Sequence, residues 1–248
     1  MRRACKILTR LVFLAAGIGA LPVRAQENSV SLNVVITPAA IKAKAPAGKV
    51  PEASNVVVWL MPLPRTKAIS GHGPPEKPPQ IVQRHKTFEP HVLVVTAGTM
   101  VQFPNKDPFF HNIFSLYDGK RFDLGLYEAG SARSVLFDRS GVSFLFCNIH
   151  VEMSAVVVSL DTPYFALSDR AGNVLIRNVP DGRYQMNVWY ERSLPESLKE
   201  LSRVVTVSDA THNFGVLHIP ENPDFTTAHK NKYGLDYVPP PNADYDHP

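Results

Sequence analysis

Residues 141–153 read Gly141-Val-Ser-Phe-Leu-Phe-Cys147-Asn-Ile-His150-Val-Glu-Met153. The largely apolar run before Cys147 predicts a strand, and Ala155-Val-Val-Val-Ser-Leu160 predicts the strand that follows. Between them, a thiol, an imidazole and a thioether stand within seven residues. Short strands and turn residues dominate the rest of the chain, which indicates an all-β fold. The donor groups would then lie in loops at strand ends, where a rigid sandwich can hold them.

A second histidine stands upstream, in Pro104-Asn-Lys-Asp-Pro-Phe-Phe-His111-Asn-Ile-Phe-Ser. One thiolate, two imidazoles and a thioether form the ligand set that selects copper and suits electron transfer. We therefore predict a type 1 copper site with Cys147 as the thiolate ligand. His111 and His150 would complete a trigonal plane, and Met153 would be the weak axial ligand. Taken alone, His111 would be read as an ordinary turn histidine.

Three nearby polar residues are further candidates for the site. Asn112 follows His111 directly, and its amide groups could steady the Cys147 loop. His91 could support the ligands or bind the metal, although a partly buried structural histidine is the commoner role. Glu152 lies inside the loop and could contact copper or a partner, although a solvated carboxylate is commoner there.

The N-terminus has the pattern of a secretory signal peptide. Four basic residues within the first ten precede an apolar stretch from Leu11 to Val23, and Val23-Arg-Ala25 is a small-residue cleavage site. We expect cleavage of residues 1–25 and export to the periplasm. The apolar run is too short to favour a spanning helix, and no later segment is long and apolar enough to form one.

Loss of residues 1–25 changes how charge and cysteine content are interpreted. It removes five of the 26 basic residues and none of the 22 acidic ones, so 21 basic residues face 22 acidic ones. This balance argues against a nucleic-acid partner. Cys5 leaves as well, so Cys147 is the only cysteine of the mature chain and has no intramolecular disulfide partner. A free thiol, an intermolecular link and a metal ligand are the alternatives, and the neighbouring His150 and Met153 favour the ligand.

Three motifs together resemble the cupredoxins: Val95-x-x-Gly98 through Phe103-Pro-Asn105, then His111-Asn-Ile-Phe, and finally residues 141–153. The tight ligand loop looks most like that of amicyanin and the plastocyanin-like "methylamine utilization" proteins of bacteria. The resemblance covers roughly residues 88–160. It implies a Greek-key sandwich with copper at one pole and a role in electron transfer. Ile149 stands where amicyanin has proline, a departure that concerns the reduction potential rather than the metal.

A second unit follows the copper domain, which we place at 29–160. Residues 161–219 contain Asp169-Arg-Ala-Gly172 and Asn178-Val-Pro-Asp-Gly-Arg-Tyr184, which resemble transthyretin-like or carboxypeptidase-regulatory-like β-sandwich modules. Such a resemblance concerns fold and carries almost no information about chemistry. Residues 220–248 are proline-rich with few aliphatic side chains, so we expect an extended tail.

Two N-terminal segments are harder to assign. Seven prolines fall from Pro62 to Pro90, which predicts a long irregular loop over 62–90. The predicted strand over 55–60 could belong to either unit, so the placement of 29–61 within the copper domain is left open.

These observations predict an exported one-electron carrier, not an enzyme, with one copper per chain cycling between Cu(II) and Cu(I). Electrons would pass through His150 or its apolar surroundings to a redox partner protein. The alternative is a copper-trafficking or copper-sensing protein that holds Cu(I) without rapid electron exchange. A copper oxidase or reductase is disfavoured, because the remaining histidines do not form a second cluster in the sequence.

Overall fold

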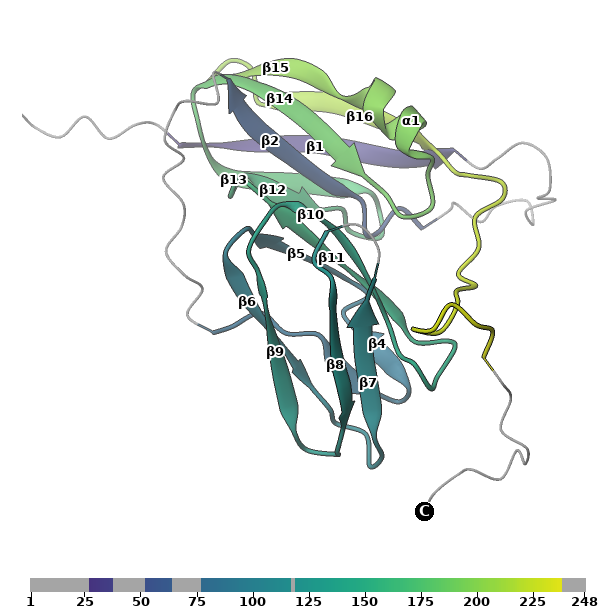
Figure 1. Cartoon of the computed structure of the whole chain (residues 1–248). Helices are drawn as coiled ribbons and strands as arrows, with labels where there is room; N and C mark the ends of the chain where they lie inside the picture. The colour runs from purple at the N-terminus through teal and green to yellow at the C-terminus, as the bar shows by residue number, and fades with distance from the viewer. Residues whose placement is uncertain (1–26, 38–51, 64–76, 117–118, 238–248) are drawn as a thin grey trace, which may run out of the picture.

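The computed structural model describes residues 27–37, 52–63, 77–116 and 119–237. Regular structure in these residues is almost entirely β, with one short helix, α1 (Pro195–Leu201), as the all-β prediction requires. The chain forms two units, one above the other in Figure 1. The predicted signal peptide lies outside the described residues. No helix in the described part of the chain is long and apolar enough to cross a membrane.

The lower unit, here called the inserted unit, contains the predicted ligands. One of its sheets has the strand order β5-β11-β10-β7-β8, and the other contains the pair β6-β9. Isolated bridges join Gln80, just before β3, to Gln102 of β6, and Gln83 of β3 to Asn105, the residue after β6. The strands are β3 (Val82–Arg84), β4 (Thr87–Glu89), β5 (Val92–Thr96), β6 (Thr99–Pro104), β7 (His111–Ser115), β8 (Phe122–Tyr127), β9 (Ala132–Phe137), β10 (Gly141–Phe146) and β11 (Ser154–Leu160).

Alternating apolar residues of both sheets form the core of the inserted unit. Val101 and Phe103 of β6 are fully buried in it, together with Leu145 of β10 and Val157 of β11. Cys147 belongs to the same buried cluster. The predicted ligand loop is therefore attached directly to the buried core of this unit.

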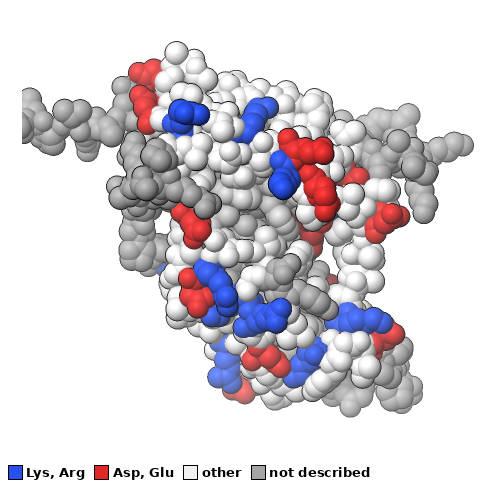
Figure 2. Space-filling model, turned by 45° about the horizontal axis from the view of Figure 1, so that its top comes forward, with Lys and Arg blue, Asp and Glu red and all other residues white. Residues whose placement is uncertain are grey.

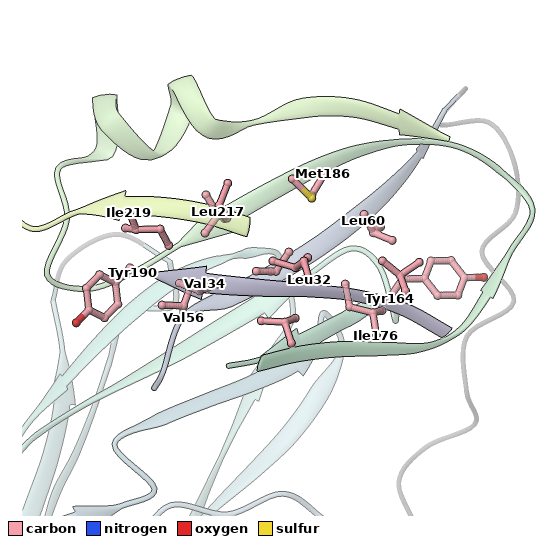
Figure 3. Packing of buried hydrophobic residues seen from close by; sticks show 14 of the residues in the cluster. Leu32, Val34, Val56, Leu60, Tyr164, Ile176, Met186, Tyr190, Leu217 and Ile219 are labelled. Carbon is pink, nitrogen blue, oxygen red and sulfur yellow. The ribbon is translucent and has the colours of Figure 1, made fainter. Parts of the chain in front are cut away.

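The upper unit, here called the enclosing unit, is built from both ends of the described chain. A three-stranded sheet has the order β13-β1-β16, and a four-stranded sheet has the order β12-β2-β14-β15. Their apolar faces pack together, with Leu32 and Val34 of one sheet opposite Leu60 and Met186 of the other (Figure 3). The strands are β1 (Glu27–Thr37), β2 (Val57–Leu63), β12 (Phe165–Leu167), β13 (Asn173–Pro180), β14 (Gly182–Trp189), β15 (Arg203–Val207) and β16 (Asn213–Pro220).

Strand pairing places the N-terminal strands in the enclosing unit, not in the domain predicted for 29–160. β1 lies between β13 and β16, and β2 lies between β12 and β14. The inserted unit therefore interrupts the enclosing unit between β2 and β12. The sequence could not show this, because β1 and β2 each have an apolar face that either unit could bury. The strands with which they pair lie more than 100 residues away in the sequence.

Two other expectations are corrected in the proline-rich regions. Pro62 and Leu63 complete β2, and residues 82–89 form the β3-β4 hairpin, so the loop predicted over 62–90 is not irregular throughout. Residues 64–76 lie outside the described part. In the predicted tail, residues 221–237 contain no strand or helix but are bonded to both units. Residues 238–248 are not described.

The two units meet through an apolar interface. Val57 and Trp59 of β2 turn toward the inserted unit, whereas Val58 and Leu60 turn into the enclosing core. β11 divides its side chains in the same way, with Val156 and Val158 at the interface. A strand buried on both faces needs apolar residues at consecutive positions, which explains why these segments lack polar alternation.

An ion pair supplements this interface. The Nε2 atom of His91 lies 2.6 Å from a carboxylate oxygen of Glu191, while Nδ1 donates to the carbonyl of Ser154 at 3.1 Å. Glu191 follows β14 of the enclosing unit. The hydrogen bond to Glu191 raises the pKa of His91, against the opposing effect of burial. Stabilisation by this pair is therefore present below the ordinary histidine pKa and is lost as pH rises through the raised value.

We predict that Glu191→Gln lowers the free energy of unfolding at pH 5.5 by about 0.5–1 kcal/mol, the range of a partly exposed ion pair. At pH 9 the loss should be much smaller, because His91 is then neutral. Urea unfolding of the metal-free protein at both pH values measures the difference. Glu128→Gln, at an exposed glutamate, is the control, and an equal loss at pH 5.5 and pH 9 would contradict the assignment.

Candidate metal centre

The loop between β10 and β11 carries three of the predicted ligands, Cys147, His150 and Met153. Phe146 pairs with Ser154 at the end of the β10-β11 ladder, so the loop begins and ends at adjacent points. The amide of Cys147 donates to the carbonyl of Met153 at 3.2 Å, and the amide of Met153 donates to the carbonyl of His150 at 3.1 Å. These hydrogen bonds close residues 147–153 into a tight turn.

His111 joins this loop from the neighbouring strand. It is the first residue of β7, which pairs with β10 through Phe114 and Phe146. The Sγ atom of Cys147 lies 3.9 Å from Nδ1 of His111 and 3.6 Å from Nδ1 of His150. Cys147 and His111 are fully buried and His150 is half-buried. The structure thus brings one thiol and two imidazole nitrogens to a single point.

These distances and donor types fit a transition-metal ion. Metal–nitrogen and metal–sulfur bonds of about 2.0–2.3 Å at trigonal angles separate the donor atoms by roughly 3.5–4 Å. The measured separations fall in that range. A His2Cys trigonal set is the donor arrangement of mononuclear copper electron-transfer centres. Among the described residues, these three are the group of histidine, cysteine and acidic side chains whose ligand atoms converge in this way.

Asp107 is part of the site, although no sequence motif singles it out. Its carboxylate accepts a hydrogen bond from Nε2 of His111 at 2.8 Å and from the amides of His85 and Lys86 at 2.6 and 3.0 Å. The bond from Nε2 fixes the tautomer of His111 and leaves Nδ1 free to bind a metal. The only available signal was the spacing of four residues between Asp107 and His111, which is uninformative without the turn that bends the chain between them.

The turn that faces Asp107 explains how the carboxylate is held. His85 and Lys86 connect β3 to β4 with φ angles of 53° and 55°, a left-handed conformation that directs both amides at one acceptor. Burial pushes the pKa of Asp107 upward, but the hydrogen bonds from Lys86, His111 and His85 outweigh it and lower the pKa. Asp107 is therefore an ionised acceptor near neutral pH.

Burial also decides the protonation of the metal-free donors. It lowers the pKa of His111 and of His150, which keeps both imidazoles neutral near pH 7. It raises the pKa of the Cys147 thiol, while hydrogen bonds from the backbone amides of Asn112, Ile149 and His150 oppose the rise. A metal that binds here would displace the thiol proton. The three amides are placed to stabilise the resulting thiolate.

The remaining predicted site residues occupy different positions. Met153 is fully buried in the core cluster that contains Cys147. The side-chain amide of Asn112 donates to Asp123 at 2.7 Å, so it is the backbone amide of this residue, rather than its side chain, that reaches Cys147. Glu152 is exposed on the loop. His91 supports the loop from outside, through its bond to the carbonyl of Ser154, the residue after Met153.

Aromatic rings shield the converging donors. The ring of Phe109 lies 5.2 Å from that of His111 and 5.7 Å from that of His150, measured between centroids. Phe110, in contrast, is 55% exposed. Phe109 thus packs against both imidazoles, and the next residue, Phe110, faces solvent.

Comparison with known proteins finds likeness in structure only. No protein-family model matches this chain, and no curated protein sequence matches it. Solved structures that resemble it include a purple cupredoxin from Nitrosopumilus maritimus, with 25% identity and a TM-score of 0.30 over 33% of this chain and 98% of that one.

Two further structures resemble it over a similar length. The copper-containing nitrite reductase of Thermus scotoductus has 21% identity and a TM-score of 0.33, over 37% of this chain and 24% of the reductase. A methionine-to-alanine mutant of amicyanin in its Cu(I) form has 19% identity and a TM-score of 0.32, over 33% of this chain and 81% of amicyanin. The structural neighbours are thus cupredoxins matched over about a third of the chain. The assignment of a metal rests on the donor set itself.

We predict that Asp107→Asn weakens copper binding by roughly 10–100-fold, the usual effect of losing a group that orients a ligand. In the metal-free protein it should lower the free energy of unfolding by about 1–3 kcal/mol at pH 7. Folding lowers the pKa of Asp107, so this stabilisation is complete above the ordinary carboxyl pKa and is lost as pH falls through the lowered value. The difference should therefore shrink over that range. Competition with a copper chelator and urea unfolding measure the two effects.

Asp138→Asn is the matched control, since Asp138 forms an exposed ion pair with Lys120. Equal copper affinity in the Asp107 and Asp138 variants would show that Asp107 does not orient His111.

Proposed function

We propose that this chain is an exported type 1 copper protein that carries single electrons between partner proteins. The observation that supports this most directly is the convergence of one buried thiol and two imidazole nitrogens within 4.8 Å of one another. Bound copper, one ion per chain, would supply a Cu(II)/Cu(I) couple. Residues 1–25 would direct the chain to the periplasm and be removed there.

The protein's own part in electron transfer would be to hold its donors still. The Cys147 thiolate would form the most covalent bond to the metal, and Met153 would be a weak axial donor. His111 is fixed from behind by Asp107, and Cys147 is fixed by the β10-β11 ladder. A site held in one geometry for both oxidation states needs little rearrangement when an electron arrives or leaves.

Electrons would enter and leave beside His150, the half-buried member of the set. Its surroundings are apolar and open to solvent, with Phe110 at 55%, Ile149 at 47% and Val151 at 48% exposure. Exposed apolar residues grouped around a reactive centre are typical of a protein docking site. This rim would receive a redox partner protein.

The distribution of charge is in keeping with a protein partner. On the face shown in Figure 2, basic and acidic side chains of the described residues are interspersed. Nucleic-acid binding usually requires a continuous basic patch or stripe. The enclosing unit, which we assign to the carboxypeptidase-regulatory-like class, would present the copper unit rather than bind a second copper.

We predict that Cys147→Ser abolishes the intense visible charge-transfer band of the Cu(II) protein, because a hydroxyl cannot replace the covalent thiolate donor. Metal analysis of the parent protein should find about one copper per chain, and its colour should bleach and return rapidly on reduction and reoxidation. Ser143→Ala, which changes a buried hydroxyl elsewhere on β10, is the control.

Two outcomes would contradict this proposal in different ways. A colourless parent that binds Cu(I) tightly and resists oxidation would favour the copper-trafficking or copper-sensing alternative. Two tightly bound coppers per chain would instead revive an enzymatic role.

We predict further that Met153→Gln keeps copper and blue-type colour but lowers the reduction potential, whereas Met153→Leu raises it. The glutamine oxygen is a stronger axial donor than the thioether and stabilises Cu(II), whereas leucine provides no axial donor and so favours Cu(I). Voltammetry measures both shifts. Glu152→Gln/Met153→Leu tests whether the exposed carboxylate replaces the lost thioether. Parental potentials in both single variants would exclude Met153 as the axial ligand.

A further inference from the structure

The C-terminal segment, residues 221–237, links the enclosing unit to the ligand loop. It begins at the end of β16, where the amide of Glu221 donates to the carbonyl of Thr37 at 3.0 Å and the amide of Asn222 donates to the carbonyl of Arg192 at 2.7 Å. From there it descends beside the inserted unit as the yellow trace of Figure 1. Its described end therefore lies far from the core to which its start is attached.

Two side chains of this segment contact Cys147 and the residue before it, Phe146. The hydroxyl of Tyr237 donates to the backbone carbonyl of Cys147 at 2.6 Å. The ring of His229 stacks on Phe146, with centroids 4.1 Å apart and an interplanar angle of 31°. The Tyr237 oxygen also lies 3.3 Å from Nδ1 of His229. The hydroxyl and the imidazole thus hold each other as well as the loop.

A third residue connects the segment to both ligand-bearing elements. The amide of Lys232 donates to the side-chain oxygen of Asn148 at 3.0 Å, directly after Cys147. Its ammonium group lies 2.8 Å from Asp123, which also accepts the side-chain amide of Asn112. Asn112 adjoins His111, so the segment reaches the surroundings of both imidazole and thiol ligands.

The presence of histidine at position 229, in place of an apolar ring, indicates a role in hydrogen bonding as well as in stacking. Nε2 of His229 is buried and has no hydrogen-bond partner among the described residues. Burying an unpaired ring nitrogen is unfavourable, and stacking on Phe146 alone would be served as well by an apolar ring. The compensating feature is Nδ1, whose N–H has two acceptors at 3.3 Å, the carbonyl of Lys230 and the Tyr237 oxygen. The Tyr237 hydroxyl in turn donates to the Cys147 carbonyl.

From these contacts we infer that Tyr237 and His229 are positioning residues of the copper centre. This inference rests on the proposed copper function and adds a part of the chain to it. A hydrogen bond to the Cys147 carbonyl fixes the plane of the peptide that follows Cys147, and the stacked ring limits motion of Phe146 before it. With the backbone fixed on both sides, Sγ is aimed at the two imidazoles before a metal binds, which is how preorganised sites are supported.

The test uses Tyr237→Phe, which removes one hydroxyl, and His229→Phe, which keeps a ring on Phe146 but removes Nδ1. Tyr233→Phe makes the same chemical change on a side chain that is 71% exposed. Its ring lies 5.3 Å from the Lys232 ammonium group, so this variant controls for loss of a tyrosine hydroxyl in the segment away from Cys147 and Phe146. The first readout is amide hydrogen exchange of residues 148–151 in the metal-free protein. We expect Tyr237→Phe to exchange about fivefold faster, the effect of one lost hydrogen bond, and His229→Phe to change in the same direction.

The second readout is the Cu(II) protein. The thiolate charge-transfer band should shift or broaden in both variants, and Cu(I) should pass to a chelator about fivefold faster than from the parent, again the effect of one hydrogen bond. Tyr233→Phe should match the parent in every measurement. A melting temperature that falls while the band stays at its parental position would show mere packing and overturn the inference, whatever the exchange rates.

Failure of the copper function would be recognised separately. If the parent binds no copper or shows no thiolate band, the proposed function fails, but exchange in the metal-free loop still reports on Tyr237. Faster exchange in Tyr237→Phe would then support positioning of the loop. Exchange equal to that of Tyr233→Phe would overturn the inference, with or without copper.

Discussion

The ladder between β10 and β11 constrains both the metal centre and the contact between the two units. Its last pair, Phe146 and Ser154, sets the ends of the ligand loop close together. Alternate residues of the same strands face opposite directions, so Leu145 packs into the inserted core while Phe144 packs against the enclosing unit. A shift of one residue in this register would exchange the two faces and would move Cys147 out of the core.

The centre combines a dry interior with polar support. Burial alone would leave His111 free to choose either tautomer and either ring orientation. Asp107 removes this freedom, and it can remain ionised because two backbone amides of the β3-β4 turn bind it as well. A buried carboxylate with three donors avoids the cost of an unpaired charge. Through Asp107, the β3-β4 hairpin is thereby linked to His111 of β7 in the five-stranded sheet.

The order of segments along the chain has a structural consequence for the ligand loop. β1 and β2 come first in the sequence, followed by the inserted unit and then by the remaining strands of the enclosing unit. Residues 221–237 then lead back to the ligand loop. The loop is therefore supported on several sides: His91 binds the carbonyl of Ser154, and Tyr237 binds the carbonyl of Cys147. His91 is itself paired with Glu191 of the enclosing unit, and Tyr237 lies in the segment that follows that unit in sequence.

The sequence by itself determined the all-β class, the donor types and the placing of Cys147, His150 and Met153 in one tight loop, because short spacing limits how far apart these residues can lie. The donor types also predicted His111, since a second imidazole completes the ligand set that copper prefers. Tertiary structure alone decided the place of β1, whose Val34 pairs with Leu217, and the roles of Asp107, His229 and Tyr237. These depend on which distant segments meet, and an apolar strand, a carboxylate or a tyrosine can serve many partners until the packing of the whole chain selects one.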